Sequence, residues 1–112
     1  MNEIKLQITY DDFAKLDLRV GQIKEVSEVD GADKLYKIIV NIGEADIQIL
    51  SGIKEFFTKE MLIGKQIIVL VNLEPRKMKG EISNGMLLVV DGESGVNLLK
   101  PENIAGAGEL IR

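Results

Sequence analysis

Residues 65–90, with the sequence KQIIVLVNLEPRKMKGEISNGMLLVV, are the most informative stretch of this chain. The run from Lys65 to Asn72 is mostly apolar and rich in β-branched residues, which is typical of a strand buried on both faces. A second apolar run begins at Met86 and predicts the next strand. A proline and two glycines punctuate the stretch between them, so it is interpreted as a shaped loop on a rigid scaffold, where binding residues concentrate.

This loop, residues 72–88, reverses the charge of the chain. Residues 54–80 carry six bases against three acids, although the whole chain has a net charge of −4. The densest cluster consists of Arg76, Lys77 and Lys79. A local basic cluster in an acidic protein can bind phosphate at one place and repel it elsewhere, which favours shape-specific recognition of a polyanion.

Composition indicates one domain over residues 1–112. The 112 residues, 46% of them hydrophobic and 29% charged, suffice for one core and resemble globular averages. No apolar run approaches the roughly 20 residues that a membrane helix requires. The N-terminus lacks the basic and then apolar order of a secretory signal, so a cytoplasmic protein that is not bound to a membrane is expected.

The chain contains no histidine and no cysteine. Disulfides, thiolate metal ligands and nucleophilic designs based on a histidine are therefore excluded. The 18 acidic residues show no catalytic spacing, and turns or caps explain the acids near Asp11 and Asp30 more simply than magnesium does. We expect no enzymatic activity, no metal site and no cofactor.

The remaining segments predict short elements. Thr9 with Asp12 forms a capping box that starts a short helix ending at Lys15. Alternating residues predict a first strand from Leu18 to Val26, with Gly21 marking a bulge or bend. The later expected elements are strand Leu35–Ile42, strand Ile47–Leu50, helical turns over Lys54–Leu62, strand Met86–Asp91 and strand Val96–Leu99. This order predicts an all-β OB-fold, a five-stranded Greek-key barrel with a short N-terminal helix and a short helix between strands 3 and 4.

Residues 12–23, DFAKLDLRVGQI, resemble the opening of the tRNA-binding domain of the methionyl-tRNA synthetase C-terminal or β-subunit family. Ser51-Gly52-Ile53 and the loop from Asn72 to Met86 look like its two other signatures, so the resemblance covers about residues 10–112. The resemblance implies an OB-fold that recognises the shape of tRNA, usually as a homodimer. It also implies a non-catalytic module that adds tRNA affinity to the catalytic subunit or domain of methionyl-tRNA synthetase.

The basic loop supplies the main candidate tRNA-binding residues. Arg76, Lys77 and Lys79 can each offset phosphate charge without reading sequence, although a solvated basic turn would look the same. Asn72 ends the buried strand, where its amide can contact a base edge or a 2′-hydroxyl, or cap the strand instead.

The resemblance adds further candidates. Ser83 and Met86 match positions that the family associates with tRNA contact, through a small hydroxyl and a polarizable thioether, although a methionine that opens an apolar strand can equally be core. Three outlying bases, each also explicable as an ordinary exposed residue, could extend the positive surface: Arg19, Lys34 and Lys54.

Two alternatives remain at this level. The first is a peptide-binding chaperone of the export-related relatives with this fold, which is disfavoured because the chain keeps Pro75-Arg76-Lys77 and Gly85-Met86. The second is a purely structural dimerisation module of the synthetase. Aromatic residues make up only 4% of the chain, which argues against a generic single-strand binder.

Two apolar stretches of the chain could support dimerisation. Apolar residues alternate at Ile4, Leu6 and Ile8 near the N-terminus, and Leu110-Ile111 lies near the C-terminus. Both stretches could bind a second copy or could finish the core.

Overall fold

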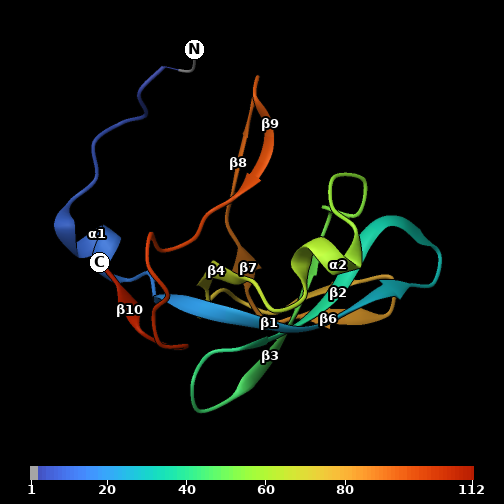
Figure 1. Ribbon diagram of the computed structural model, residues 1–112. Coiled ribbons are helices and arrows are strands. Elements are labelled where there is room, and N and C mark those ends of the chain that lie inside the picture. The colour runs from blue at the N-terminus through green and yellow to red at the C-terminus, as the bar shows by residue number, and fades with distance from the viewer. Residues whose placement is uncertain (1–2) are drawn as a thin grey trace.

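Strand β1 (Leu18–Val29) organises the computed structural model, which describes residues 3–112 (Figure 1). Its first part pairs antiparallel with β4 (Gln66–Leu70), from Leu18 opposite Leu70 to Gln22 opposite Gln66. From Gln22 onward it pairs with β2 (Ala32–Asn41), so one long strand belongs to both halves of the sheet. A register shift between Ile23 and Glu25 bends β1 where it passes from one partner to the other.

The main sheet rolls up until its two ends meet. Its order is β3-β2-β1-β4-β7, with β3 at Asp46–Ser51 and β7 at Met86–Leu87. The edge strand β3 then reaches the chain just before β7, where Asn84 N donates to Gln48 O at 2.8 Å and Leu50 N donates to Ser83 Oγ at 3.0 Å. These two bonds close an antiparallel barrel of the OB type.

Two hairpins and two short helices complete the molecule. Hairpin β5 (Arg76–Met78) with β6 (Glu81–Ser83) lies next to the barrel closure, and β8 (Val89–Gly92) with β9 (Gly95–Leu98) rises away from the barrel in Figure 1. Helix α1 (Tyr10–Ala14) precedes β1, α2 (Lys59–Leu62) lies between β3 and β4, and β10 (Leu110–Ile111) pairs with the start of β1.

The capping box at the N-terminal helix is confirmed. Thr9 Oγ1 accepts from Asp12 N at 3.1 Å, and Asp12 Oδ2 accepts from Thr9 N at 3.2 Å. Thr58 caps α2 similarly, because its hydroxyl accepts from Met61 N at 3.3 Å. In residues 3–112 neither helix, nor any other, is long and apolar enough to cross a membrane.

The core has two parts. The main cluster fills the barrel, and its most deeply buried side chains are Ile23, Ile38, Val40, Ile49, Leu62, Ile67 and Val69. A smaller cluster of Val29, Ala32 and Leu50 lies beside it, with Met78 of β5 packed against it. Met78 therefore attaches the β5–β6 hairpin to the barrel through apolar contact.

The all-β OB-type fold and both short helices are as expected, while several details differ. The main sheet has six strands including β10, so the count of five is not confirmed. The basic loop contains the β5–β6 hairpin, whose three-residue strands are too short to show a period in sequence. The predicted strand Met86–Asp91 is two strands in the structure. Its first part pairs with β4, where Leu88 N also donates to Ile68 O, and from Val89 onward the chain pairs with β9 instead.

One further boundary and the position of the bulge in β1 differ from the prediction. The helix between β3 and β4 begins only at Lys59, because Phe56 and Phe57 first form a turn whose amides donate to Ile53 O. Gly21 itself stays in register with Ile67, and the bulge in β1 lies beyond it, after Ile23. Gly21 instead permits close packing, since a Cβ there would lie 2.5 Å from Val40 Cγ1.

Gly21→Ala is therefore expected to lower the free energy of unfolding by about 1–3 kcal/mol, because a core methyl group has to move. Denaturant unfolding followed by circular dichroism measures the change. The matched control is Gly92→Ala, where a Cβ meets nothing within 4 Å. A Gly21→Ala protein as stable as this control would contradict the packing role.

Candidate nucleic-acid interface

The β5–β6 hairpin presents the basic cluster to solvent. Its strands pair Arg76 with Ser83, Lys77 with Ile82 and Met78 with Glu81. The side chains of Arg76, Lys77 and Lys79 are exposed, and no ion pair within residues 3–112 involves them. Three uncompensated positive charges therefore sit within four residues of a short hairpin.

The turn of this hairpin is strained at its lysine. Lys79 has φ 51° and Gly80 has φ 82°, as in a type I′ turn. Lys79 is the single non-glycine residue with positive φ in residues 3–112. Asparagine is preferred at this position of such turns, and a lysine in the left-handed region costs of the order of 1 kcal/mol. A positive charge thus occupies a position where turn geometry favours another residue.

A groove of about 300 Å³ adjoins the hairpin. Ser51 and Gly52 line it from the end of β3, and Arg76 and Met86 line it from β5 and β7. Two sequence signatures that lie far apart in the chain therefore meet around one concave surface. Met86 lines this groove and is 43% exposed, so it is not part of the core.

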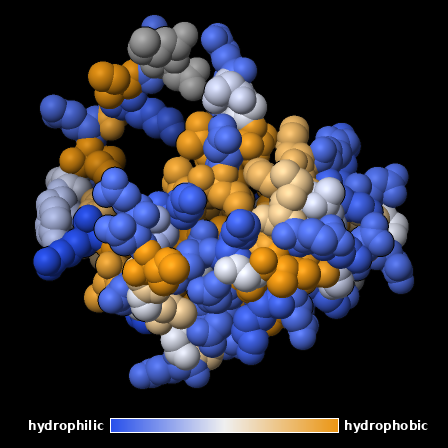
Figure 2. Space-filling model, in the orientation of Figure 1, coloured by the Kyte–Doolittle hydropathy of each residue, from blue (hydrophilic) through white to orange (hydrophobic). Residues whose placement is uncertain are grey.

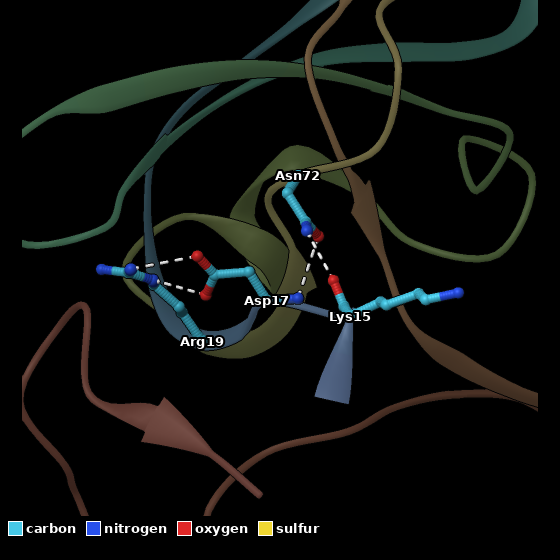
Figure 3. A network of polar contacts seen from close by, with 4 residues as sticks. All are labelled: Lys15, Asp17, Arg19 and Asn72. Atoms are coloured by element: carbon cyan, nitrogen blue, oxygen red, sulfur yellow. Dashed lines mark hydrogen bonds and ion pairs between the residues drawn. The ribbon is translucent and has the colours of Figure 1, made fainter. Parts of the chain in front are cut away.

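Asn72 lies away from the groove and joins two segments of backbone (Figure 3). Its Oδ1 accepts from Asp17 N at 2.9 Å, and its Nδ2 donates to Lys15 O at 2.7 Å. The amide thus connects the end of β4 to the link between α1 and β1. Both ends of the side-chain amide are engaged, as the capping alternative requires.

Ser83 is buried, with 4% of its surface exposed. Its Oγ accepts from Leu50 N at 3.0 Å and donates to Gly85 O at 2.9 Å. The hydroxyl is therefore held by backbone partners, and its single donor is used. Ser83 also lines the groove, but in this conformation its hydroxyl is buried and cannot donate to RNA.

Arg19 is separated from the hairpin and compensated by an acid. It makes two bonds to Asp17, with Nε to Oδ1 at 2.8 Å and Nη2 to Oδ2 at 3.0 Å (Figure 3). These hydrogen bonds from Arg19 are the main reason that the pKa of Asp17 is lowered, and they raise the pKa of Arg19. With Asn72 and Leu110 it lines a different depression, so the structure does not bring Arg19 to the groove.

The two other outlying bases differ from each other. Lys54 Nζ lies 2.6 Å from Glu28 Oε1, and the hydrogen bond to this carboxylate is the main reason that the pKa of Lys54 is raised. Its charge is therefore largely balanced. Lys34 is exposed and has no ion-pair partner among the described residues, and its backbone carbonyl lies beside Gly52 at the groove. Of the outlying bases, Lys34 fits the interface better.

Sequence reasoning missed Gln48, a residue of β3 that contacts the hairpin. Gln48 Nε2 donates to Ile82 O at 2.9 Å and to Glu81 Oε1 at 3.3 Å. These contacts join residues more than 30 positions apart, so no local sequence motif predicts them. The only sequence signal is the alternation of β3, which places Gln48 on the face opposite Ile47 and Ile49.

Comparisons with known proteins identify the family of this chain. Residues 18–110 match the family described as "Putative tRNA binding domain". Methionine–tRNA ligase of Francisella tularensis is 43% identical over 110 residues, which is 98% of this chain but 16% of that ligase. The chain thus spans about one sixth of the length of the curated relatives that it matches.

Two solved structures have the same fold. The MetRS-related protein from Pyrococcus horikoshii superposes with a TM-score of 0.89 at 32% identity, covering 96% of this chain and 100% of that one. The CsaA chaperone protein from Picrophilus torridus superposes with a TM-score of 0.87 at 37% identity, covering 95% and 100%. A barrel with a basic hairpin beside a groove defines an OB-type binding module. The chain belongs to the tRNA-binding domain family.

Ser83→Ala should lower the free energy of unfolding by about 1–3 kcal/mol, because it leaves the Leu50 amide and the Gly85 carbonyl without their buried partner. Chemical denaturation measures the loss. Ser94→Ala, in the exposed turn between β8 and β9, is the control and should change stability by less than about 0.5 kcal/mol. Equal stabilities of the two variants would show that the Ser83 hydroxyl is dispensable.

Lys79→Asn should raise the free energy of unfolding by up to about 1 kcal/mol, since asparagine tolerates the left-handed conformation better than lysine does. Lys77→Asn removes the same charge from the same hairpin at a strand position and should give no such gain. Thermal unfolding of both variants makes the comparison. A similar gain in both would assign the effect to charge and not to turn geometry.

Proposed function

We propose that this chain is a non-catalytic module that binds tRNA through the β5–β6 hairpin and the adjacent groove. It adds tRNA affinity to methionyl-tRNA synthetase, as a C-terminal domain or as a separate β-subunit in the cytoplasm. The observation that carries this proposal is the set of three exposed hairpin bases that form no ion pair within residues 3–112, one of which, Arg76, lines the groove. The family match and the methionine–tRNA ligase relatives supply the identity of the RNA.

The ion pairs favour this interface over the surfaces around Arg19 and Lys54. Arg19 and Lys54 already neutralise acids, so binding phosphate there would first require breaking an internal contact. Arg76, Lys77 and Lys79 require no such exchange. Each can displace a condensed counterion from the RNA, and this release is the main source of affinity in phosphate binding.

The groove adds a concave surface to the positive charge of the hairpin. Its rim includes Arg76, and its lining includes Met86 and the backbone around Gly52. A charged hairpin beside a concave surface can bind a folded RNA whose phosphates have a fixed arrangement. Such binding raises the local concentration of tRNA near a linked catalytic unit without any active site in this domain.

A second copy of the chain is part of the proposal. Ile4, Leu6 and Ile8 are 100%, 94% and 69% exposed, so the alternating N-terminal stretch does not finish the core. Figure 2 shows apolar atoms along this segment and beside the β8–β9 hairpin. An apolar surface of this kind is typical of a protein interface, and a homodimer would cover it.

Peptide binding is the second candidate function. The CsaA structure shares the fold at 37% identity, and the groove has apolar lining from Leu35, Leu50 and Leu73. Exposed bases on the hairpin contribute little to holding an apolar peptide. Affinities for tRNA and for an unfolded peptide, measured on the same protein, separate the two functions.

Arg76→Ala and Lys77→Ala should each weaken tRNA binding, and each should reduce the slope of log affinity against log salt by about one. Fluorescence titrations with tRNA over a range of salt concentrations give both quantities, with duplex DNA and a minihelix RNA as reference ligands. Lys100→Ala removes the same charge from an exposed position in a different depression and is the matched control. Unchanged affinity in both single variants and in the double variant would refute the proposed interface.

A further inference from the structure

The basic strand β5 depends on β6 for its polar attachment to the barrel. Within residues 3–112, the backbone of β5 pairs with β6 alone, and no side-chain hydrogen bond or ion pair of Arg76, Lys77 or Met78 reaches the barrel. The packing of Met78 against the small core cluster is apolar and does not fix direction. The orientation of the bases therefore depends on what holds β6.

Gln48 contacts β6 and the residue that follows it at three points. Its Nε2 donates to Ile82 O at 2.9 Å and to Glu81 Oε1 at 3.3 Å, and its carbonyl accepts from Asn84 N at 2.8 Å. Ile82 is the partner of Lys77 across the hairpin, and Glu81 is the partner of Met78, next to the turn. One side chain on β3 thus holds the two residues opposite the basic strand.

Glu81 is held from a second strand as well. Its Oε2 lies 3.5 Å from Lys37 Nζ on β2, while its Oε1 accepts from Gln48. The carboxylate, which is the single acid within the hairpin, is therefore directed toward β2 and β3. Gln48 stabilises this arrangement without adding any charge of its own.

We infer that Gln48 is a positioning residue for tRNA binding: it fixes the β5–β6 hairpin so that its bases meet the phosphates in one prearranged geometry. The inference rests on the proposed interface. A two-stranded hairpin of three-residue strands is not stable by itself, and ordering it during binding would reduce affinity. Prearrangement by Gln48 removes that cost before tRNA arrives.

The role of Gln48 in positioning can be separated from a role in folding. Its bond to the Ile82 carbonyl is solvent-exposed, so water can replace the lost donor when the side chain is removed. Ser83, by contrast, holds β6 through a buried hydroxyl, and removing it disturbs the barrel closure itself. Gln48 is therefore the better residue for a test.

Gln48→Leu should lower tRNA affinity by about three- to tenfold, the usual effect of losing one or two such hydrogen bonds. It should also reduce the salt slope. Gln48 is neutral, so removing it reduces the slope only if bases elsewhere lose their phosphate contacts. Gln48→Met, which keeps a side chain of similar length, gives the same two readouts if leucine prevents folding.

Gln66→Leu is the matched control. Gln66 also joins distant segments through its amide, accepting from Ala105 N at 3.0 Å, but on a part of the barrel that the hairpin does not contact. It should leave both affinity and salt slope unchanged. Thermal midpoints of both variants confirm that each is folded at the temperature of the titration.

A double-mutant cycle completes the test. In a background with Arg76→Ala, Lys77→Ala and Lys79→Ala, Gln48→Leu should have no further effect, because the residues through which it acts are absent. An unchanged slope in the single variant, or an equal loss in this background, would overturn the positioning role alone. Wild-type affinity in the triple variant would instead overturn the interface itself.

Discussion

The hydrogen bonds between β3 and residues 82–84 link the barrel to the candidate interface. They close the barrel, since β3 and β7 are the two ends of the rolled sheet. They also hold β6, and β6 holds the basic strand β5. Loss of these hydrogen bonds would therefore open the core and release the binding surface together. The Ser83 hydroxyl takes part in them, and Ser83 is accordingly buried.

Ion pairs separate Arg19 and Lys54 from the bases of the hairpin. Arg19 and Lys54 stabilise local structure through Asp17 and Glu28 and are largely neutralised. The bases of the hairpin form no ion pair within residues 3–112, and Glu81, the acid within the hairpin, is instead engaged by Lys37 and Gln48. The positive potential of the protein is thus concentrated by pairing charges elsewhere as much as by clustering bases in one loop.

Local sequence signals predicted much of the fold but less of the site. The capping box at Thr9 and the apolar run after Lys65 act over a few residues, so their elements were predictable. The roles of Asn72 and Ser83 were not, because their amide and hydroxyl bond backbone that is 55 and 33 positions away, respectively. A polar residue in a loop looks the same in sequence whether it meets a ligand or a distant strand. Only strand pairing distinguishes the two.

The left-handed conformation of Lys79 has a consequence for protein engineering. Standard rules for hairpin design would place asparagine before Gly80, and a stability screen would reward that exchange. The gain in thermal stability would come with the loss of a charge at the tip of the surface that we assign to tRNA. Variants of this domain selected for melting temperature alone would therefore fold more stably but bind RNA more weakly. The turn at residues 79–80 is the position where such selection would first act.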